Sequence, residues 1–409
     1  MAAPQARRAF LKDVGALLRG SALRPLALAG LASLLVSFDS AVLILALPAI
    51  AADFHTSVAG LSRLGSALEL GAIAALPIAM QADRVGRRRL LILSVAGFSV
   101  ANLLSAAAPS LAWLAAARVL AVCFETVAGG VATALVIEEV APDQRGLAVA
   151  AITIAAGAGA GLTTVLYPLV APHWRVLYLA GGGGLVGAVV LAVLLRESRA
   201  WTASTASEGP PRVPLRVLLE PRWRPRLVVV AASGALGALL YGPASLLSAL
   251  YGSRALGLGP TAISAVMVVS GIVSLPAFVV GGRLSDRWGR RRLGAALSVL
   301  TAVFTAATFA GSRGAYWAGN VLWSVLASAG VPVLGAWYGE LFPTRARATS
   351  ESVGSVAGAL GGVAGFQLVA LLQPALGLGP SLVAIAAGAV ASSLLLLLLP
   401  ETRGDALAP

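Results

Sequence analysis

Four ionisable side chains of this sequence lie inside long apolar stretches, where charged residues are rare. They are Asp39, Glu69, Arg118 and Glu125. A charge at the centre of a lipid bilayer costs at least a few kcal/mol, so such residues are seldom retained without a role. A carboxylate there can take up a proton or pair with a cation, as a proton-coupling or substrate-binding group must. We therefore treat these four residues as the candidate site.

Two of these charges are spaced to interact on one helix. Arg118 and Glu125 are seven residues apart, about two helical turns, so they project from nearly the same face. The pair either changes partners during a functional cycle or is static and structural, and both interpretations stay open. Asp39 serves either proton or substrate binding or a structural hydrogen bond. Glu69 either faces a cavity or bonds a neighbouring helix.

The composition predicts the elements that carry these residues. The chain has 409 residues, of which 58% are hydrophobic and 11% charged, with a mean hydropathy of +0.89. These values exclude a soluble domain. A bilayer-spanning helix needs about 20 mostly apolar residues, and backbone polar groups in lipid must be satisfied within the segment. We therefore predict an all-α membrane protein with twelve transmembrane helices, near residues 25–50, 58–80, 89–108, 111–137, 146–171, 176–195, 227–250, 260–282, 293–311, 315–338, 348–373 and 380–399.

The basic residues predict the orientation of these helices. Lys and Arg number 30 and give a net charge of +13, but they cluster before the first span and in alternate loops. The positive-inside rule places both termini in the cytoplasm, which predicts a multi-pass protein of the inner (cytoplasmic) membrane. The sequence pI of about 11.3 is explained by these loops, so nucleic acid is not an expected partner. The first apolar run is too long for a cleaved signal peptide.

Metal and disulfide chemistry are not expected. Cys123 is the only cysteine, and the two histidines, His55 and His173, lie far apart in the sequence. The chain therefore lacks a recognisable metal-ligand cluster, and no cofactor is expected.

One basic phrase occurs twice and divides the chain into similar halves. The eight residues 83–90 recur, with one conspicuous change, as residues 286–293, which is 203 positions later. A duplicated membrane bundle is the plan of a secondary transporter. The predicted domains are an N-terminal six-helix bundle (1–195), a cytoplasmic linker (196–226) and a C-terminal six-helix bundle (227–409).

Each copy of the phrase has the properties of a cytoplasmic latch. Gly86 and Gly289 permit a tight turn between antiparallel helices. Asp83 and Asp286 fall at helix ends, where a carboxylate can pair with arginines or with the N-terminus of a neighbouring helix. Such pairs can favour one conformation by a few kcal/mol.

This phrase also carries a family resemblance. The pattern Gly-x-x-x-Asp-Arg-x-Gly-Arg-Arg is complete in 282–291, whereas the first copy has Ala79 in place of its first glycine. Two copies at equivalent places make the chain resemble the major facilitator superfamily across nearly its full length. Phrases after the fourth, sixth, tenth and twelfth spans make it most similar to the sugar porter and metabolite–proton symporter branches.

The resemblance implies cytoplasmic salt-bridge networks that hold one conformation. Carried over by motif position, the residues of this gate are Asp83, Arg84, Gly86, Arg87, Glu139, Arg145, Glu197, Asp286, Arg287, Gly289, Arg290, Glu340, Arg347 and Glu401. One departure concerns spacing. Two residues separate Pro142 from Arg145, but three separate Pro343 from Arg347, so the two networks need not be identical.

The C-terminal half offers neutral polar candidates rather than charges. Tyr241, Asn320, Trp323 and Gln367 lie in predicted spans and are possible pocket-lining residues, although each is individually compatible with packing. Gly361 and Gly365, four residues apart in the eleventh span, predict close packing against another helix.

These observations predict a function and leave alternatives. The expected activity is proton-coupled symport of a small polar solute, a sugar or organic acid, by alternating access in a monomer within the lipid bilayer. The alternatives are a proton-coupled exporter of lipophilic cations and a transporter-like solute sensor. The Gly-Pro pair usual in the fifth span of drug antiporters is absent, whereas three membrane carboxylates suit a cation. No constellation of nucleophile, base and metal indicates an enzyme.

Overall fold

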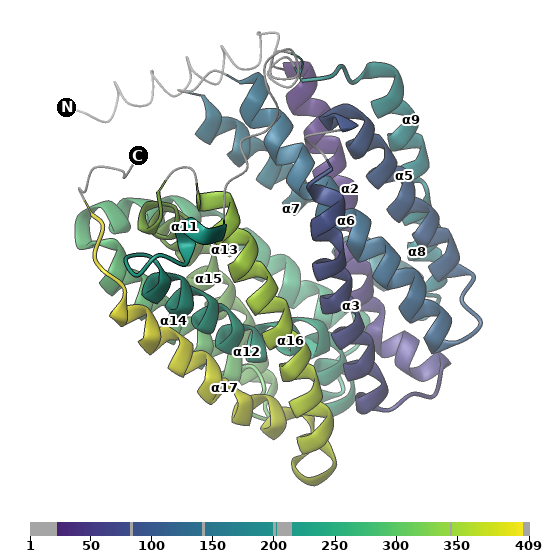
Figure 1. Ribbon diagram of the computed structural model, residues 1–409. Helices are drawn as coiled ribbons and strands as arrows, with labels where there is room; N and C mark the ends of the chain where they lie inside the picture. Colours follow the sequence, from purple (N-terminus) through teal and green to yellow (C-terminus); the bar gives the residue numbers. More distant parts are fainter. Residues whose placement is uncertain are drawn as a thin grey trace, which may run out of the picture. The chain divides into compact units, whose positions relative to one another are not determined.

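The computed structural model describes residues 23–81, 85–140, 144–198, 202, 215–343 and 346–403. Regular structure in these segments is helical, as the need to satisfy backbone hydrogen bonds inside lipid requires. The helices before the predicted linker are α2 (Leu23–Asp53), α3 (Val58–Ala79), α5 (Arg87–Ala106), α6 (Leu111–Glu139), α7 (Arg145–Val170), α8 (Arg175–Gly182) and α9 (Gly184–Leu194) (Figure 1). The later helices are α11 (Leu215–Leu218), α12 (Arg224–Leu256), α13 (Pro260–Trp288), α14 (Arg290–Ala307), α15 (Arg313–Leu341), α16 (Arg347–Leu376) and α17 (Leu378–Leu395), followed by the 3-10 turn η2 (Leu396–Leu398).

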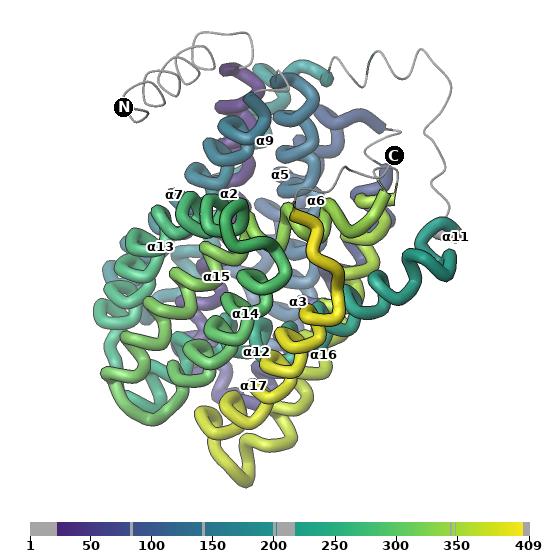
Figure 2. The backbone as a smooth tube through the Cα atoms, turned by 90° about the vertical axis from the view of Figure 1, so that its left-hand side faces the viewer, coloured from purple at the N-terminus to yellow at the C-terminus, as the bar shows by residue number. Residues whose placement is uncertain are grey.

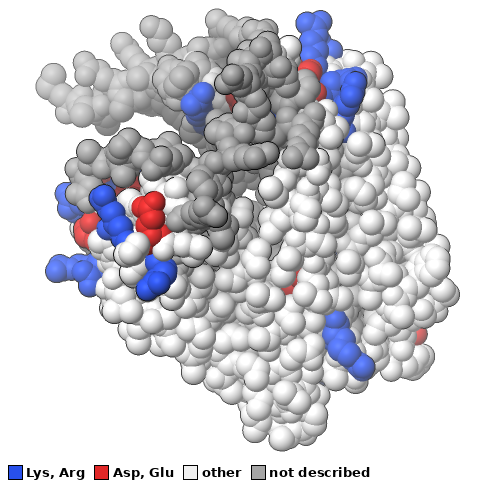
Figure 3. Space-filling model, viewed as in Figure 1, with Lys and Arg blue, Asp and Glu red and all other residues white. Residues whose placement is uncertain are grey.

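Helices occupy all twelve predicted spans. Eleven helical segments of the described chain are long and apolar enough to cross a membrane, with α8 and α9 together forming one of them. The remaining predicted span, 293–311, corresponds to α14, whose 18 residues begin with three arginines. Figure 3 shows that charged side chains on the face in view gather mostly near helix ends, while uncharged side chains cover the helix flanks. This distribution is the one expected of helices surrounded by lipid.

The packing divides the chain into two compact units. Unit 1 comprises the described residues of 1–42, 74–166 and 173–210, and unit 2 those of 43–73, 167–172 and 211–409. Helix α2 therefore contributes to both units, and α3 belongs mainly to unit 2. The predicted lobes 1–195 and 227–409 are defined by duplication rather than by packing, and they stay a prediction.

Each unit has its own helix contacts. In unit 1, α5 packs against α6, α8 and α9, and the buried Cys123 of α6 lies in this core. In unit 2, α12 packs against α16 and α17, while α15 packs against α13 and α14 (Figure 2). The short helix α11 leads into Trp223, whose buried ring joins the core of unit 2 near the start of α12.

Glycine allows α16 to approach α12 closely, as the spacing of Gly361 and Gly365 predicts. A Cβ atom at Gly361 would lie 2.0 Å from the carbonyl oxygen of Ala235, and one at Gly365 would lie 2.2 Å from that of Leu239. Backbone atoms cannot move aside as a flexible side chain can, so only glycine fits at these two positions.

Replacing Gly361 by alanine therefore tests the contact between α12 and α16. We expect Gly361→Ala to destabilise the purified protein by about 1–3 kcal/mol, the usual cost of overpacking. The control is Gly330→Ala, at a buried glycine of α15 whose Cβ would meet no heavy atom within 4 Å. Thermal unfolding in detergent provides the measurement. Equal melting temperatures for the two variants would contradict the close contact.

Candidate functional site

Three of the four predicted membrane charges form one buried cluster in unit 1. Nη1 of Arg118 donates to Oδ1 of Asp39 at 3.0 Å, and Nη2 donates to Oε1 of Glu125 at 2.9 Å. A further bond of 3.3 Å joins Nη2 to Oδ2 of Asp39. Relative exposure is 1% for both Arg118 and Asp39 and 7% for Glu125, so the group is withdrawn from the surface. The sequence spacing predicts the pair on α6, and the structure adds Asp39 of α2 to it.

Neutral polar residues complete the cluster. Oδ1 of Asn102 on α5 accepts a hydrogen bond from Nη1 of Arg118 at 2.8 Å, and the Ser40 hydroxyl donates to Oε2 of Glu125 at 2.8 Å. The guanidinium carbon of Arg118 lies 5.1 Å from the centroid of the Tyr178 ring, which is a cation–π distance. The sequence-based prediction missed these three residues. Asn102, one of only two asparagines in the chain, was a visible signal.

Neighbouring helices fix the position of the cluster. The Thr163 hydroxyl of α7 donates to the carbonyl oxygen of Phe38, directly before Asp39, at 2.8 Å. On α8, a Cβ at Gly181 would lie only 2.7 Å from Nδ2 of Asn102, so the glycine provides the space for that amide. The cluster is therefore held by four helices of unit 1 besides α2.

The cluster contains more acid than base and retains unused polar atoms. Two carboxylates face one guanidinium, so the group carries one excess negative charge when both are ionised. In addition, Nε of Arg118, Nδ2 of Asn102 and the hydroxyl of Tyr178 are buried without a hydrogen-bond partner among the described residues. Buried polar atoms are almost always satisfied, so unused ones mark a place where a proton, water or solute can be accommodated.

Glu69 does not join this cluster, and its surroundings are in unit 2. Its carboxylate packs against two glycines. A Cβ atom added at Gly242 of α12 would lie 3.1 Å from Oε1 of Glu69, and one added at Gly362 of α16 would lie 2.7 Å from it. One turn earlier on α3, the Ser66 hydroxyl accepts a 2.9 Å hydrogen bond from Nε2 of Gln367. Glu69 lines a cavity of about 390 Å³ together with residues of α12, α14, α15, α16 and α17.

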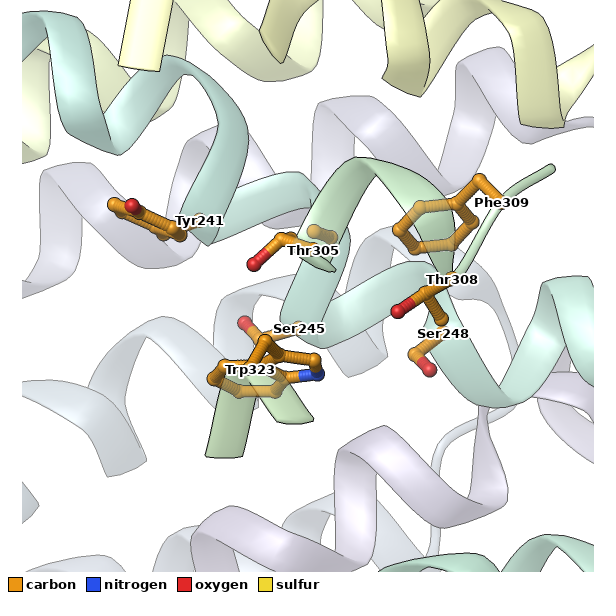
Figure 4. A pocket seen from close by; sticks show the side chains of 8 residues that line it. Tyr241, Ser245, Ser248, Thr305, Thr308, Phe309 and Trp323 are labelled. Atoms are coloured by element: carbon orange, nitrogen blue, oxygen red, sulfur yellow. The ribbon is translucent and has the colours of Figure 1, made fainter. Parts of the chain in front are cut away.

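The neutral candidates separate into different environments. Tyr241 lines the large cavity and, with Trp323, a small polar pocket of about 10 Å³ (Figure 4). That volume suits about one water molecule. Figure 4 shows hydroxyl groups from Ser245, Thr305 and Thr308 around this small pocket. Asn320 lines neither space: it is buried and donates to the carbonyl oxygen of Tyr316 one turn back.

The gate residues form two similar groups, one in each unit. The first capping cluster consists of Arg87, Glu138, Glu197 and Ser198. Nη2 of Arg87 donates to Oε1 of Glu138 at 3.0 Å, and the Ser198 hydroxyl donates to Oε2 of Glu138 at 2.5 Å. The backbone N–H of Arg88, in the first turn of α5, donates to Oε1 of Glu197 at 3.0 Å.

The second capping cluster repeats this arrangement with Arg290, Glu340, Glu401 and Thr402. Nε of Arg290 donates to Oε2 of Glu340 at 2.9 Å, and the Thr402 hydroxyl donates to the same oxygen. The backbone N–H groups of Arg290 and Arg291, at the start of α14, donate to the Glu401 carboxylate at 2.8 and 3.0 Å. A carboxylate thus caps the N-terminus of an equivalent helix in both units, where unsatisfied N–H groups and the helix dipole favour negative charge.

The structure adds one residue to the predicted gate. The carboxylate paired with Arg87 is Glu138, one residue before the predicted Glu139 at the end of α6. Glu138 precedes Arg145 by seven residues, as Glu340 precedes Arg347. The two phrases differ by one residue between proline and arginine, so counting from the proline equates Glu139 with Glu340, whereas counting back from the arginine equates Glu138 with Glu340. Glu139 stays a prediction.

The other gate residues have varied roles. The N-cap positions of α5 and α14 are Gly86 (φ 99°) and Gly289 (φ 89°), as the predicted tight turns require.

Asp286 is largely exposed and pairs with Arg290 at 3.4 Å, while Arg287 supplies a carbonyl oxygen to Arg403. Nε of Arg145 and Nε of Arg347 donate to the carbonyl oxygens of Ile137 and Phe342. Asp83 and Arg84 lie outside the described residues.

Hydrogen bonding changes the acidity of Glu401. Burial alone would raise the pKa of this carboxyl, but N–H donors from Arg290, Arg291, Arg403 and Thr402 outweigh it and lower the pKa below its ordinary value. The lowered pKa means that the folded protein favours the ionised carboxylate. Capping of α14 therefore depends on that charge.

The long apolar helices, the buried charge cluster and the duplicated capping clusters together define a polytopic membrane transporter. The profile of the Major Facilitator Superfamily matches residues 29–365 and, in a second match, residues 241–409. The chain belongs to this family, whose members are transporters of small molecules within the membrane rather than enzymes. Among the described residues, no cluster of His, Cys, Asp and Glu could hold a metal ion.

Three curated relatives have names that describe transport. The chain is 28% identical to the "Probable 4-methylmuconolactone transporter" of Cupriavidus pinatubonensis over 91% of this chain and 89% of that protein. It is 33% identical to the "Gallate transporter" of Pseudomonas putida over 36% of this chain and 33% of that one. It is 44% identical to the "Multidrug efflux pump LfrA" of Mycolicibacterium smegmatis over 97 residues, which are 23% of this chain and only 19% of the pump.

Solved structures agree on the fold. A bacterial homolog of the human lysosomal transporter Spinster has a TM-score of 0.78 at 17% identity, over 93% of this chain and 97% of the homolog. The xylose transporter XylE of E. coli has a TM-score of 0.75 at 16% identity, over the same shares of the two chains. At these identities the likeness concerns the fold alone.

The cap on α14 gives a prediction about pH. Because the folded-state pKa of Glu401 is lowered, its contribution to stability is complete above the ordinary carboxyl pKa of about 4.3 and is lost as pH falls through the lowered value. We expect Glu401→Gln to melt at a lower temperature than the wild type at neutral pH. The difference should shrink as the pH falls below about 4.

Thermal unfolding in detergent across that pH range measures this effect. The control is Glu220→Gln, at an exposed carboxylate of the chain segment before α12, and it should melt like the wild type at each pH. A destabilisation by Glu401→Gln that stays constant down to the most acidic sample would show that the charge of the cap is irrelevant.

Proposed function

We propose that this chain is a proton-coupled secondary transporter of a small organic solute, of the sugar or organic-acid class, working by symport. It acts as a monomer in the cytoplasmic membrane with both termini in the cytoplasm. Two lobes, 1–195 and 227–409, alternate the access of a central site. Support for the solute class comes from the muconolactone transporter, which is similar over nearly the whole chain.

The observation that carries the proton coupling is the sharing of Arg118 by two buried carboxylates. With Asp39 and Glu125 both ionised, one negative charge stays uncompensated in a region of low dielectric, at a cost of several kcal/mol. One bound proton removes that excess. It also frees the guanidinium to favour the carboxylate that remains ionised. Proton binding and the choice of partner by Arg118 are therefore linked.

This linkage can drive a change of conformation. Asp39 belongs to α2, whereas Arg118 and Glu125 belong to α6, so a change of partner alters the attraction between two helices. A ligand shifts a conformational equilibrium only through its different affinity for the two states, and a proton acts here in the same way. The capping clusters stay within their units and hold the helix ends during such a change.

A second candidate is proton-coupled export of lipophilic cations. It is favoured by Glu69, a membrane carboxylate for which the described residues provide no hydrogen bond or ion pair, and by the partial similarity to the efflux pump.

A solute sensor without net transport is the remaining alternative. Counterflow distinguishes the sensor from both carriers, because exchange of labelled solute requires movement of the binding site across the membrane.

Replacing Asp39 by asparagine tests the proton coupling. In proteoliposomes with a one-unit pH gradient, one coupled proton drives up to about tenfold accumulation of a neutral solute. We expect wild-type protein to accumulate its solute and Asp39→Asn to bring it only to equilibrium while retaining counterflow. Gallate, xylose and tetraphenylphosphonium are suitable labelled solutes for an initial screen. Symport predicts uptake along the proton gradient, whereas export predicts movement against it.

The control variant is Glu220→Gln, which alters an exposed carboxylate outside the cluster and should accumulate solute normally. Normal accumulation by Asp39→Asn would remove this residue from the coupling. Absence of counterflow with wild-type protein and every solute would argue instead for the sensor.

A further inference from the structure

The cavity of unit 2 has an unusual balance of polar groups. Its volume of about 390 Å³ lies within the range of small-molecule sites. Glu69 is its only charged lining residue among those described, and no lysine, arginine or histidine is found there. The other described lining residues are glycine, alanine, leucine, serine and tyrosine. An organic anion placed in this cavity would meet a carboxylate and no counter-charge.

Most hydroxyl groups of the wall are already engaged. The Ser233 hydroxyl donates to the carbonyl oxygen of Val230, and that of Ser392 donates to the carbonyl oxygen of Ser233. Ser393 bonds its own helix one turn back, and the Tyr241 hydroxyl lies 3.4 Å from the carbonyl oxygen of Ser298. A sugar needs many free donors and acceptors in exchange for its water. This cavity offers few of them.

The Glu69 carboxylate, in contrast, is available. It is half-buried, and the described residues provide no donor within hydrogen-bonding distance of it. Glycines at positions 242 and 362 hold open the space it occupies, because a Cβ at either would lie within 3.1 Å of Oε1. An unpaired carboxylate between membrane helices is costly unless it binds a proton or a cation.

The geometry points to a binding site for a lipophilic organic monocation in the cavity of unit 2, with Glu69 as its counter-charge. This inference rests on the proposed function as a transporter, and for the solute it favours the lipophilic cation of the second candidate over a sugar or organic acid. The cation competes with a proton for the same carboxylate oxygens. Tyr241 and Tyr338 contribute aromatic surface on the cavity wall, which suits a cation with apolar substituents.

Other titratable groups near Glu69 do not account for such a competition. The titratable side chains that line the cavity besides Glu69 are Tyr241 of α12 and Tyr338 of α15, and both are neutral in the relevant pH range. The facing position on α16 is Gly362. Glu351 lies in an adjoining cavity of about 260 Å³, which shares Tyr338 with the first. It is therefore the acid that a test must separate from Glu69.

Equilibrium binding of tetraphenylphosphonium to the purified full-length protein provides the test. We expect saturable binding that is stronger at about pH 8 than at about pH 3.5, because protons occupy a carboxylate below its ordinary pKa of about 4.3. Glu69→Gln should weaken binding by about tenfold or more and abolish its pH dependence. Glu69→Asp should retain part of both. Glu351→Gln and Glu220→Gln should bind like the wild type.

Several results would overturn the inference. They are pH-independent binding to the wild type, unchanged binding to Glu69→Gln, or loss of binding in Glu351→Gln rather than in Glu69→Gln. The wild-type pH profile needs no variant, so the inference stays testable if Glu69→Gln does not fold. Failure to bind the cation while proton-driven accumulation of gallate or xylose persists would remove this inference and leave the proposed function intact. Failure of every solute in counterflow would remove the proposed function itself.

Discussion

A charge that leaves water must find compensation inside the protein, and this constraint governs the polar architecture of the chain. In unit 1 the guanidinium of Arg118 meets two carboxylates, an amide and an aromatic ring within a region that is almost completely inaccessible. At the helix ends, glutamates meet backbone N–H groups and arginines. Glu69 alone, among the membrane carboxylates of the described segments, has no such compensation. The helix-end glutamates are compensated within the protein, whereas the Arg118 cluster has one carboxylate in excess and Glu69 has no partner among the described residues.

The capping clusters show how duplication preserves chemistry while sequence details change. In both units an arginine pairs with a glutamate, and a hydroxyl residue bonds the same glutamate. The acid beside that hydroxyl residue caps the helix that begins with the arginine. Serine serves in one unit and threonine in the other. Since each cluster lies within its own unit, it fixes the ends of that unit's helices. A set of rigid helix ends allows a small rearrangement at a buried site to move whole helices.

Much of this arrangement could be predicted from the residues. Long apolar runs determine the helices because lipid admits few alternatives, and two residues seven apart must share a helix face, as Arg118 and Glu125 do. The glycines that admit close backbone contact were also recognisable from their spacing. Contacts between distant segments are different. Asn102 and Tyr178 contact Arg118 because of how α5 and α8 pack in unit 1. The residues on an apolar helix surface do not indicate which other helix will pack against it.

The two halves differ by one residue in the phrase that carries the gate glutamate. Glu138 and Glu139 are adjacent, but successive residues on a helix point about 100° apart, and Glu138 forms an ion pair with Arg87. The proline suggested one alignment of the two halves and the arginine another. Counted back from the arginine, Glu138 and Glu340 occupy equivalent positions, and these are the two glutamates that pair with Arg87 and Arg290.

The excess of acid over base around Arg118 also has an electrical consequence. With one proton bound the cluster is neutral, and the potential across a membrane does no work when it is displaced. Without the proton it carries one negative charge, on which about 2.3 kcal/mol of work is done per 100 mV if the whole potential is crossed. The membrane potential therefore acts on the cluster without its proton and not on the protonated cluster. In the proposed symport of a neutral solute, the resting potential of the cell would therefore act on the return of the unloaded carrier rather than on the delivery of the solute.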